Sequence, residues 1–117
     1  MSCKQVNLNS ANCFAVNSGY DYSFNVKTST NLTGATIHFK VKSVNDVGFL
    51  LELTNTSDAS VSGVYIRDLS KGDFDIRIIA SDSASISGNK VFECYYEIGG
   101  GKELLFQGQI QFDEGVM

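Results

Sequence analysis

The stretch that decides the fold class is Thr36-Ile37-His38-Phe39-Lys40-Val41-Lys42. Apolar and polar side chains alternate along it, and successive side chains of a β-strand point to opposite faces. The stretch therefore predicts a strand with one face in a core and the other in water. The same period recurs in Tyr22-Ser23-Phe24-Asn25-Val26 and in Asp73-Phe74-Asp75-Ile76-Arg77-Ile78. By contrast, no window of a dozen residues shows the apolar spacing of a helix.

The end of the chain predicts a further strong strand. Its apolar positions are Leu104, Phe106, Ile110 and Phe112, and they alternate with Gln107, Gln109 and Gln111. Gly108, in the middle of this strand, predicts a bulge or the close approach of a neighbouring backbone. Weaker strand patterns cover residues 6–8, 13–16, 49–53, 64–67 and 92–98. The total is about nine strands, all of them short.

The predicted fold is all-β, an antiparallel immunoglobulin-like β-sandwich in a single domain. Turn formers such as Asn17-Ser18-Gly19 and Gly99-Gly100-Gly101 separate the strands at short intervals, which is typical of antiparallel hairpins. A small barrel is the alternative. Residues 19–117 are assigned to the sandwich, and residues 1–18 to an N-terminal arm or to its first strands. Ser81-Asp82-Ser83-Ala84-Ser85-Ile86 predicts one helical turn at most, capped by Ser81 or Asp82.

Composition and charge exclude several function classes. The 117 residues carry nine Lys and Arg against thirteen Asp and Glu, so 9 − 13 gives a net charge of −4. This balance disfavours a nucleic-acid partner. No apolar stretch approaches the roughly 18 residues of a membrane span, and no secretory signal opens the chain, so we expect synthesis in the cytoplasm and no membrane partner. Cys3, Cys13 and Cys94 share no metal-ligand spacing and are expected to be reduced thiols.

Catalytic constellations are weak in this sequence. The single histidine, His38, has its strand neighbours on the opposite face, so we expect it to face solvent. Asp73 and Asp75 share one strand face and could hold a cation or act in glycoside hydrolysis. Because Arg77 continues the same row, a solvated ladder of charges is the simpler interpretation. We therefore expect no enzyme activity, no cofactor and no metal.

Three groups of polar residues are candidates for interaction. Glu93, Tyr95 and Glu97 form a predicted exposed row, and a tyrosine between carboxylates can stack on a sugar ring and accept its hydroxyls. The glutamine row of Gln107, Gln109 and Gln111 could bond a partner strand or stay solvated. The third group lies in the small, polar segment 54–62, which predicts a flexible recognition loop; its members are Asn55, Ser57 and Asp58.

The order of these features resembles that of small β-sandwich domains of tailed bacteriophages, as in the N-terminal domain of baseplate upper proteins. The likeness begins with Gly19-Tyr20-Asp21-Tyr22-Ser23-Phe24 and the turn Leu32-Thr33-Gly34-Ala35, which leads into the next strand. It continues through Lys71-Gly72-Asp73-Phe74-Asp75-Ile76 and the final strand around Gln107 to Glu114-Gly115-Val116. The similarity spans residues 19–116, most of the chain.

The resemblance implies a non-enzymatic virion structural protein that acts by protein–protein docking in a tail, a baseplate, a tail-fibre attachment or a head decoration. Its partners would be other virion proteins, reached as a homo-oligomer or by attachment to a symmetric assembly. Residues 1–17 could then form an arm laid against a neighbouring subunit. The alternative function is a carbohydrate-binding or host-surface adhesion module, in which a glycan binds at Tyr95 or at the loop 54–62.

Overall fold

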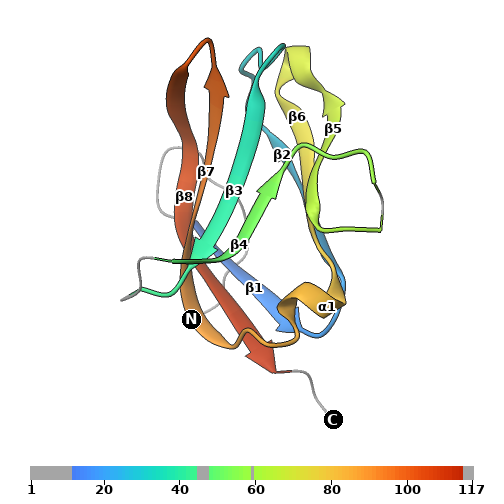
Figure 1. The fold of residues 1–117 in the computed structure, drawn as a ribbon, viewed down its shortest axis with the longest axis vertical. Coiled ribbons are helices and arrows are strands. Elements are labelled where there is room, and N and C mark those ends of the chain that lie inside the picture. Colours follow the sequence, from blue (N-terminus) through green and yellow to red (C-terminus); the bar gives the residue numbers. More distant parts are fainter. Residues whose placement is uncertain (1–11, 45–47, 59, 115–117) are drawn as a thin grey trace.

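Two β-sheets packed face to face make up the protein (Figure 1). The computed structural model describes residues 12–44, 48–58 and 60–114, and within them the side chains of all but residues 12–14 and 114. The strands are β1 (Asn12–Ser18), β2 (Tyr22–Lys27), β3 (Thr36–Lys42), β4 (Phe49–Thr54), β5 (Gly63–Asp68), β6 (Asp73–Ile78), β7 (Gly88–Ile98) and β8 (Gly101–Glu114). Short helical turns follow β5 and β6, namely η1 (Leu69–Lys71) and α1 (Ala80–Ser83).

The five-stranded sheet has the order β1-β8-β7-β3-β4, and the three-stranded sheet the order β2-β6-β5. Because the sheets pair separately, the sandwich prediction is confirmed and the barrel alternative is wrong. All pairs are antiparallel except β1 and β8, which run parallel toward the end of the sandwich that carries α1 (Figure 1). These two strands lie at opposite ends of the chain, so no hairpin forces them to run antiparallel.

The predicted strands are present throughout the described residues. The segment 6–8 lies outside them. Residues 12–18, assigned to an arm or to first strands, form β1, and Val16 is buried at 1% exposure. Of the two alternatives given for this segment, residues 12–18 fit the first-strand one, because they belong to a sheet of the sandwich; residues 1–11 lie outside the described part of the chain.

The core fills the space between the sheets. It is built from the apolar faces that the period of two predicted on β3, β6 and β8, with Val26 and Leu32 from the neighbouring strand and loop. Four phenylalanines contact one another in a chain that crosses from one sheet to the other: Phe24, Phe39, Phe92 and Phe106. Centroid distances in this chain are 6.0, 5.3 and 5.7 Å, within the range of favourable aromatic pairs. The aromatic chain thus ties the two sheets together.

A register shift in β8 places Leu104 on the outside. The sequence pattern predicted Leu104 on the core face with Phe106, but Leu104 is 53% exposed. The pairing moves from Cys94 opposite Phe106 to Tyr95 opposite Leu104, so the intervening Leu105 is an extra residue on β8. The predicted bulge at Gly108 is wrong in position, because Gly108 pairs in regular register with Phe92.

The β7–β8 turn is the hairpin that the glycine run predicted. Ile98 pairs with Gly101, so Gly99 and Gly100 form a two-residue turn with φ of 58° and 83°. Positive φ at both central residues is the requirement of the turn type that matches the twist of a hairpin.

The helical turn predicted within residues 81–86 is present as α1, which begins one residue earlier, and its cap differs from the predicted one. Ile79 is the N-cap residue and makes no side-chain cap hydrogen bond. Instead the Ala80 amide donates to Asp21 Oδ1 at 2.8 Å, from the turn between β1 and β2. Buried Ser83 adds a second link, since its hydroxyl accepts from the Gly19 amide at 3.0 Å. Among the described residues no helix has the length and apolarity to cross a membrane.

Candidate functional site

Tyr95 is the centre of the outer face of the five-stranded sheet. It lies opposite His38 in the pairing of β7 with β3, and the two rings stack at 4.7 Å with an interplanar angle of 12°. His38 Nε2 lies 2.8 Å from Glu97 Oε1. The His38 side chain is only 17% exposed because Tyr95 and Glu97 cover it. His38 thus points away from the core, as predicted, but contacts its neighbours rather than open solvent.

Two lysines flank the Tyr95 ring. Lys40 Nζ and Lys102 Nζ each lie 5.4 Å from its centroid, within the distance of a cation–π contact. Lys40 Nζ also lies 4.8 Å from the Phe49 ring and 3.7 Å from Glu52 Oε1. A hydrogen bond to Tyr95, together with the charge of Glu52, raises the pKa of Lys40. Lys40 therefore stays charged and joins three strands across the sheet.

Exposed apolar side chains border this packed centre. Leu104, on β8, lies opposite Tyr95. Phe49, on β4, is 41% exposed and lies under the Lys40 ammonium. We call the following set the outer-face cluster: His38, Lys40, Phe49, Tyr95, Glu97, Lys102 and Leu104. The cluster offers apolar surface and both signs of charge on a backbone held by four paired strands.

The outer face also brings together the two rows that the sequence singled out. Glu93 lies directly opposite Gln107 in the pairing of β7 with β8, and Gln109 and Gln111 follow along β8. Gln111 donates to Asp113 Oδ1 at 2.6 Å. The sequence analysis treated the two rows as separate candidates. The pairing of β7 with β8 places both rows on one surface.

The prediction of an exposed Tyr95 is wrong. Tyr95 is 7% exposed, since His38 stacks on its ring and two lysines flank it. Glu93 and Glu97 are half-buried on the same face. A ring covered in this way has no open face for a sugar to stack on. Sequence reasoning missed five members of the outer-face cluster as interaction residues, and the signal for Phe49 was an aromatic residue next to a turn. These five are His38, Lys40, Phe49, Lys102 and Leu104.

The third predicted group, in the β4–β5 loop, lies apart from the outer-face cluster. The Asn55 side chain accepts from the Ile37 amide at 2.8 Å and donates to the Ala35 carbonyl at 3.3 Å. Asn55 therefore fixes the loop to the start of β3. Asp58 accepts from the Ser60 amide and hydroxyl, and these bonds lower the pKa of its carboxyl group.

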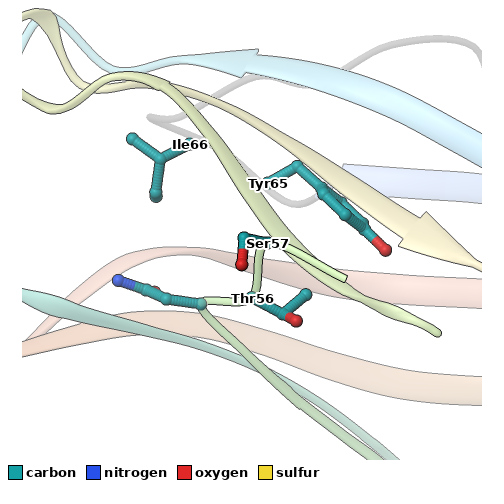
Figure 2. A pocket seen from close by; sticks show the side chains of 5 residues that line it. Thr56, Ser57, Tyr65 and Ile66 are labelled. Carbon is teal, nitrogen blue, oxygen red and sulfur yellow. The ribbon is translucent and has the colours of Figure 1, made fainter. Parts of the chain in front are cut away.

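A shallow pocket of about 420 Å³ opens beside this loop. Figure 2 shows its lining, which comes from the loop and from β5: Asn55, Thr56, Ser57, Tyr65 and Ile66. The Tyr65 hydroxyl donates to the carbonyls of Asp58 and Val61, which anchors the loop to β5. Two of the predicted residues, Asn55 and Ser57, line the pocket, whereas the contribution of β5 became visible only in three dimensions.

Asp73 and Asp75 share one amide donor from the neighbouring strand. Asn25 Nδ2, on the neighbouring β2, donates to Asp73 Oδ1 at 2.8 Å and to Asp75 Oδ1 at 2.9 Å. Arg67 Nε bonds both oxygens of Asp75, at 3.0 and 2.9 Å. Among the described residues no group of three or more His, Cys, Asp or Glu side chains could hold a metal ion. The pair is thus part of a polar network on the outer face of the three-stranded sheet.

This network predicts a pH dependence of stability. The hydrogen bonds from Arg67 and Asn25 lower the pKa of Asp75. A carboxyl group whose pKa is lower in the folded state stabilises the fold above its unfolded pKa of about 3.9, and this contribution is lost as the pH falls through the folded value. We expect Asp75→Asn to lower the free energy of unfolding near pH 7, with a difference from wild type that shrinks at acid pH. Urea unfolding at a series of pH values measures it.

Arg67→Gln is the matched variant for this prediction, because it removes the main partner and keeps the carboxylate. In Arg67→Gln the free energy of unfolding should therefore fall less between neutral and acid pH than it does in wild type. A difference between wild type and Asp75→Asn that stays constant through acid pH would contradict the assignment.

The comparisons with known proteins bear on the fold alone. No protein-family model matches the chain, and no curated protein does. Among solved structures, a chain of the ZIG-8–RIG-5 IG1–IG1 heterodimer is similar over 93% of this chain and 88% of its own, with a TM-score of 0.50 at 13% identity. The chain has an immunoglobulin-like fold. With β2 counted as strand B, the three-stranded sheet matches B, E and D, and β8-β7-β3-β4 match G, F, C and C′.

The immunoglobulin-like core lacks the disulfide of antibody domains. Cys94 lies on β7, the strand that carries one half of that bridge, but the opposite strand β2 has no cysteine. Cys94 is fully buried, and burial strongly raises the pKa of its thiol. Phe24 on β2 and Phe39 on β3 occupy the space between the sheets. Aromatic packing therefore replaces the covalent link in this immunoglobulin-like domain.

Proposed function

We propose that this immunoglobulin-like domain is a non-enzymatic structural protein of a tailed-phage virion, and that it docks other virion proteins through the outer-face cluster. The observation that carries the docking role is the combination of exposed Leu104 and Phe49 with a rigid centre of stacked and charged side chains. Large apolar side chains around a preordered centre favour a protein partner, since little side-chain entropy is lost on binding. The phage setting rests on the resemblance of residues 19–116 to phage β-sandwich domains.

The similar solved structure supports the same class of function. Its chain is one half of a heterodimer between two immunoglobulin domains, so a domain of this fold takes part in protein–protein association there. For this chain the partners would be virion proteins arranged with symmetry. The covered Tyr95 ring disfavours the carbohydrate-binding alternative at that residue.

The test is incorporation into particles. Quantitative mass spectrometry of gradient-purified virions should find a copy number near a small multiple of three or six for a tail or baseplate role, and hundreds for a head decoration. Absence of the chain from clean particles would overturn the virion assignment.

Point variants test the docking face separately. Leu104→Asp and Phe49→Asp should each lower incorporation by about tenfold or more, because a charge is placed in a desolvated contact. Ser23→Asp is the matched control, since Ser23 is exposed on β2 in the other sheet. Normal incorporation of both face variants, with circular dichroism showing that they fold, would contradict docking through this face.

A further inference from the structure

The pocket beside the β4–β5 loop lies at an open edge of the smaller sheet. β5 is an outer strand in the order β2-β6-β5. On the free side of β5, the loop pairs with it at one isolated bridge, between Asn55 and Val64, where the Thr56 amide donates to the Val64 carbonyl at 2.9 Å. The pairing does not continue, since the next loop amide, that of Asp58, donates to Thr56 Oγ1. Beyond Val64, no described strand therefore covers this edge of β5.

The direction of the Val64 carbonyl shows which backbone groups this edge presents. In an antiparallel pair, the N–H and C=O of one residue point to the same side, and successive residues alternate between the partner strand and the free side. Because the Val64 carbonyl points to the loop, the groups of Tyr65 point to β6 and those of Ile66 point to the free side. The register with β6 is regular from Val64 to Ile66, so the alternation holds over these residues.

The Ile66 backbone is part of a pocket whose walls are ordered. Figure 2 shows the side chains of Tyr65 and Ile66 on β5 and those of Thr56 and Ser57 on the adjoining loop segment. The lining offers hydroxyl, amide and apolar groups and carries no charge. Hydrogen bonds hold the Asn55 and Tyr65 side chains to other segments, so little order remains to be gained on binding.

We propose that this site binds a short extended peptide of a partner protein, which adds a strand to β5. The peptide main chain bonds to the Ile66 amide and carbonyl, and one of its side chains occupies the pocket. Strand addition of this kind takes affinity from main-chain bonds and specificity from side-chain pockets. The side chain is uncharged, because an uncharged lining does not compensate the cost of burying a charge. The added strand is short, since the extra residue Arg67 breaks the register directly after Ile66.

A peptide fits the exposed groups better than a sugar does. Each peptide unit carries one N–H and one C=O in the spacing of a strand, which matches the donor and acceptor of Ile66. The site belongs to the smaller sheet and contains no member of the outer-face cluster. The inference therefore goes beyond the proposed function, and it stands or falls independently of docking through the outer face.

Amide hydrogen exchange in the free full chain tests the open edge. The Ile66 amide should show a protection factor at least about tenfold lower than that of the Tyr65 amide, which lies in the ladder with β6. Equal and strong protection of both amides would show that Ile66 already has a partner, and would overturn the proposal.

Selection from a random library of short peptides, with the full chain as target, tests the ligand. Enriched peptides should bind Ser57→Trp at least about tenfold more weakly than wild type, because the indole fills the pocket. Ser23→Trp is the matched control, since Ser23 is exposed on β2 at the opposite edge of the same sheet, and it should change the affinity less than about twofold. Bound peptide should also raise the protection of the Ile66 amide and leave that of Tyr65 unchanged.

Three results of the selection would contradict the proposal. The first is that no peptide is enriched. The second is that the enriched peptides bind Ser57→Trp as tightly as wild type, or leave the Ile66 amide unprotected; the protection measurement decides even if Ser57→Trp does not fold. The third is that a glycan array shows binding to wild type that Ser57→Trp abolishes, which would assign the pocket to a carbohydrate.

Discussion

Gly72→Ala is expected to lower the free energy of unfolding by about 3 kcal/mol, the sum of left-handed backbone strain and a steric clash. Gly72 ends η1 with φ of 64°. A Cβ atom there would lie 1.9 Å from Thr28 Oγ1 and 2.5 Å from the Thr30 carbonyl oxygen. The loop after β2 is bonded to this position, since the Thr28 amide donates to the Gly72 carbonyl at 3.0 Å. Chemical denaturation of the purified variant measures the loss.

Gly88→Ala separates the two causes of that loss. Gly88 has φ of 86°, but beyond its chain neighbours no atom lies within 4 Å of the position of its Cβ. It should therefore show only the backbone cost, about 1 kcal/mol. Equal losses in Gly72→Ala and Gly88→Ala would show that the clash with the loop after β2 adds nothing to the cost of the Gly72 substitution.

Phe39→Ala is expected to cost about 3 to 5 kcal/mol, the usual cost of truncating a fully buried phenylalanine. Phe39 is 0% exposed and sits in the middle of the aromatic chain, where its ring contacts Phe24 on the opposite sheet and Phe92 on β7. In the absence of a disulfide between β2 and β7, this contact joins the two sheets directly. Thermal and urea unfolding, monitored by circular dichroism, measure the effect.

Phe49→Ala is the matched control on the same sheet. Phe49 is 41% exposed and touches Lys40 across the surface, so its loss should cost less than about 1 kcal/mol. The two variants remove the same atoms from a buried and from an exposed position. A similar loss of stability in both would contradict the central place given to Phe39.

The strands could be predicted because their signal is local. Each of the described strands was placed from the sequence, and the core faces of β2, β3 and β6 are those that the alternation indicated. Leu104 was predicted on the wrong face because the register shift at Leu105 depends on how β8 pairs with β7. Alternation along one strand does not show which strand it pairs with, or in which register. For the same reason the parallel pairing of β1 with β8 could not be predicted.

The candidate site was only partly predictable. Glu93 and the glutamine row were found as outward-facing residues, but their meeting depends on the strand register. Tyr95 was predicted on the correct face and with the wrong exposure, because His38, Lys40 and Lys102 cover it from other strands.

By itself, the sequence determined that this chain is an all-β sandwich. The period of two and the turn residues are local properties, and they fix which side chains enter a core. The tertiary structure alone decided which strands are neighbours, and with them the outer-face cluster and the bridge of Asn25 between Asp73 and Asp75. The reason is that these features are contacts between residues far apart in the chain, which exist only after the strands have paired.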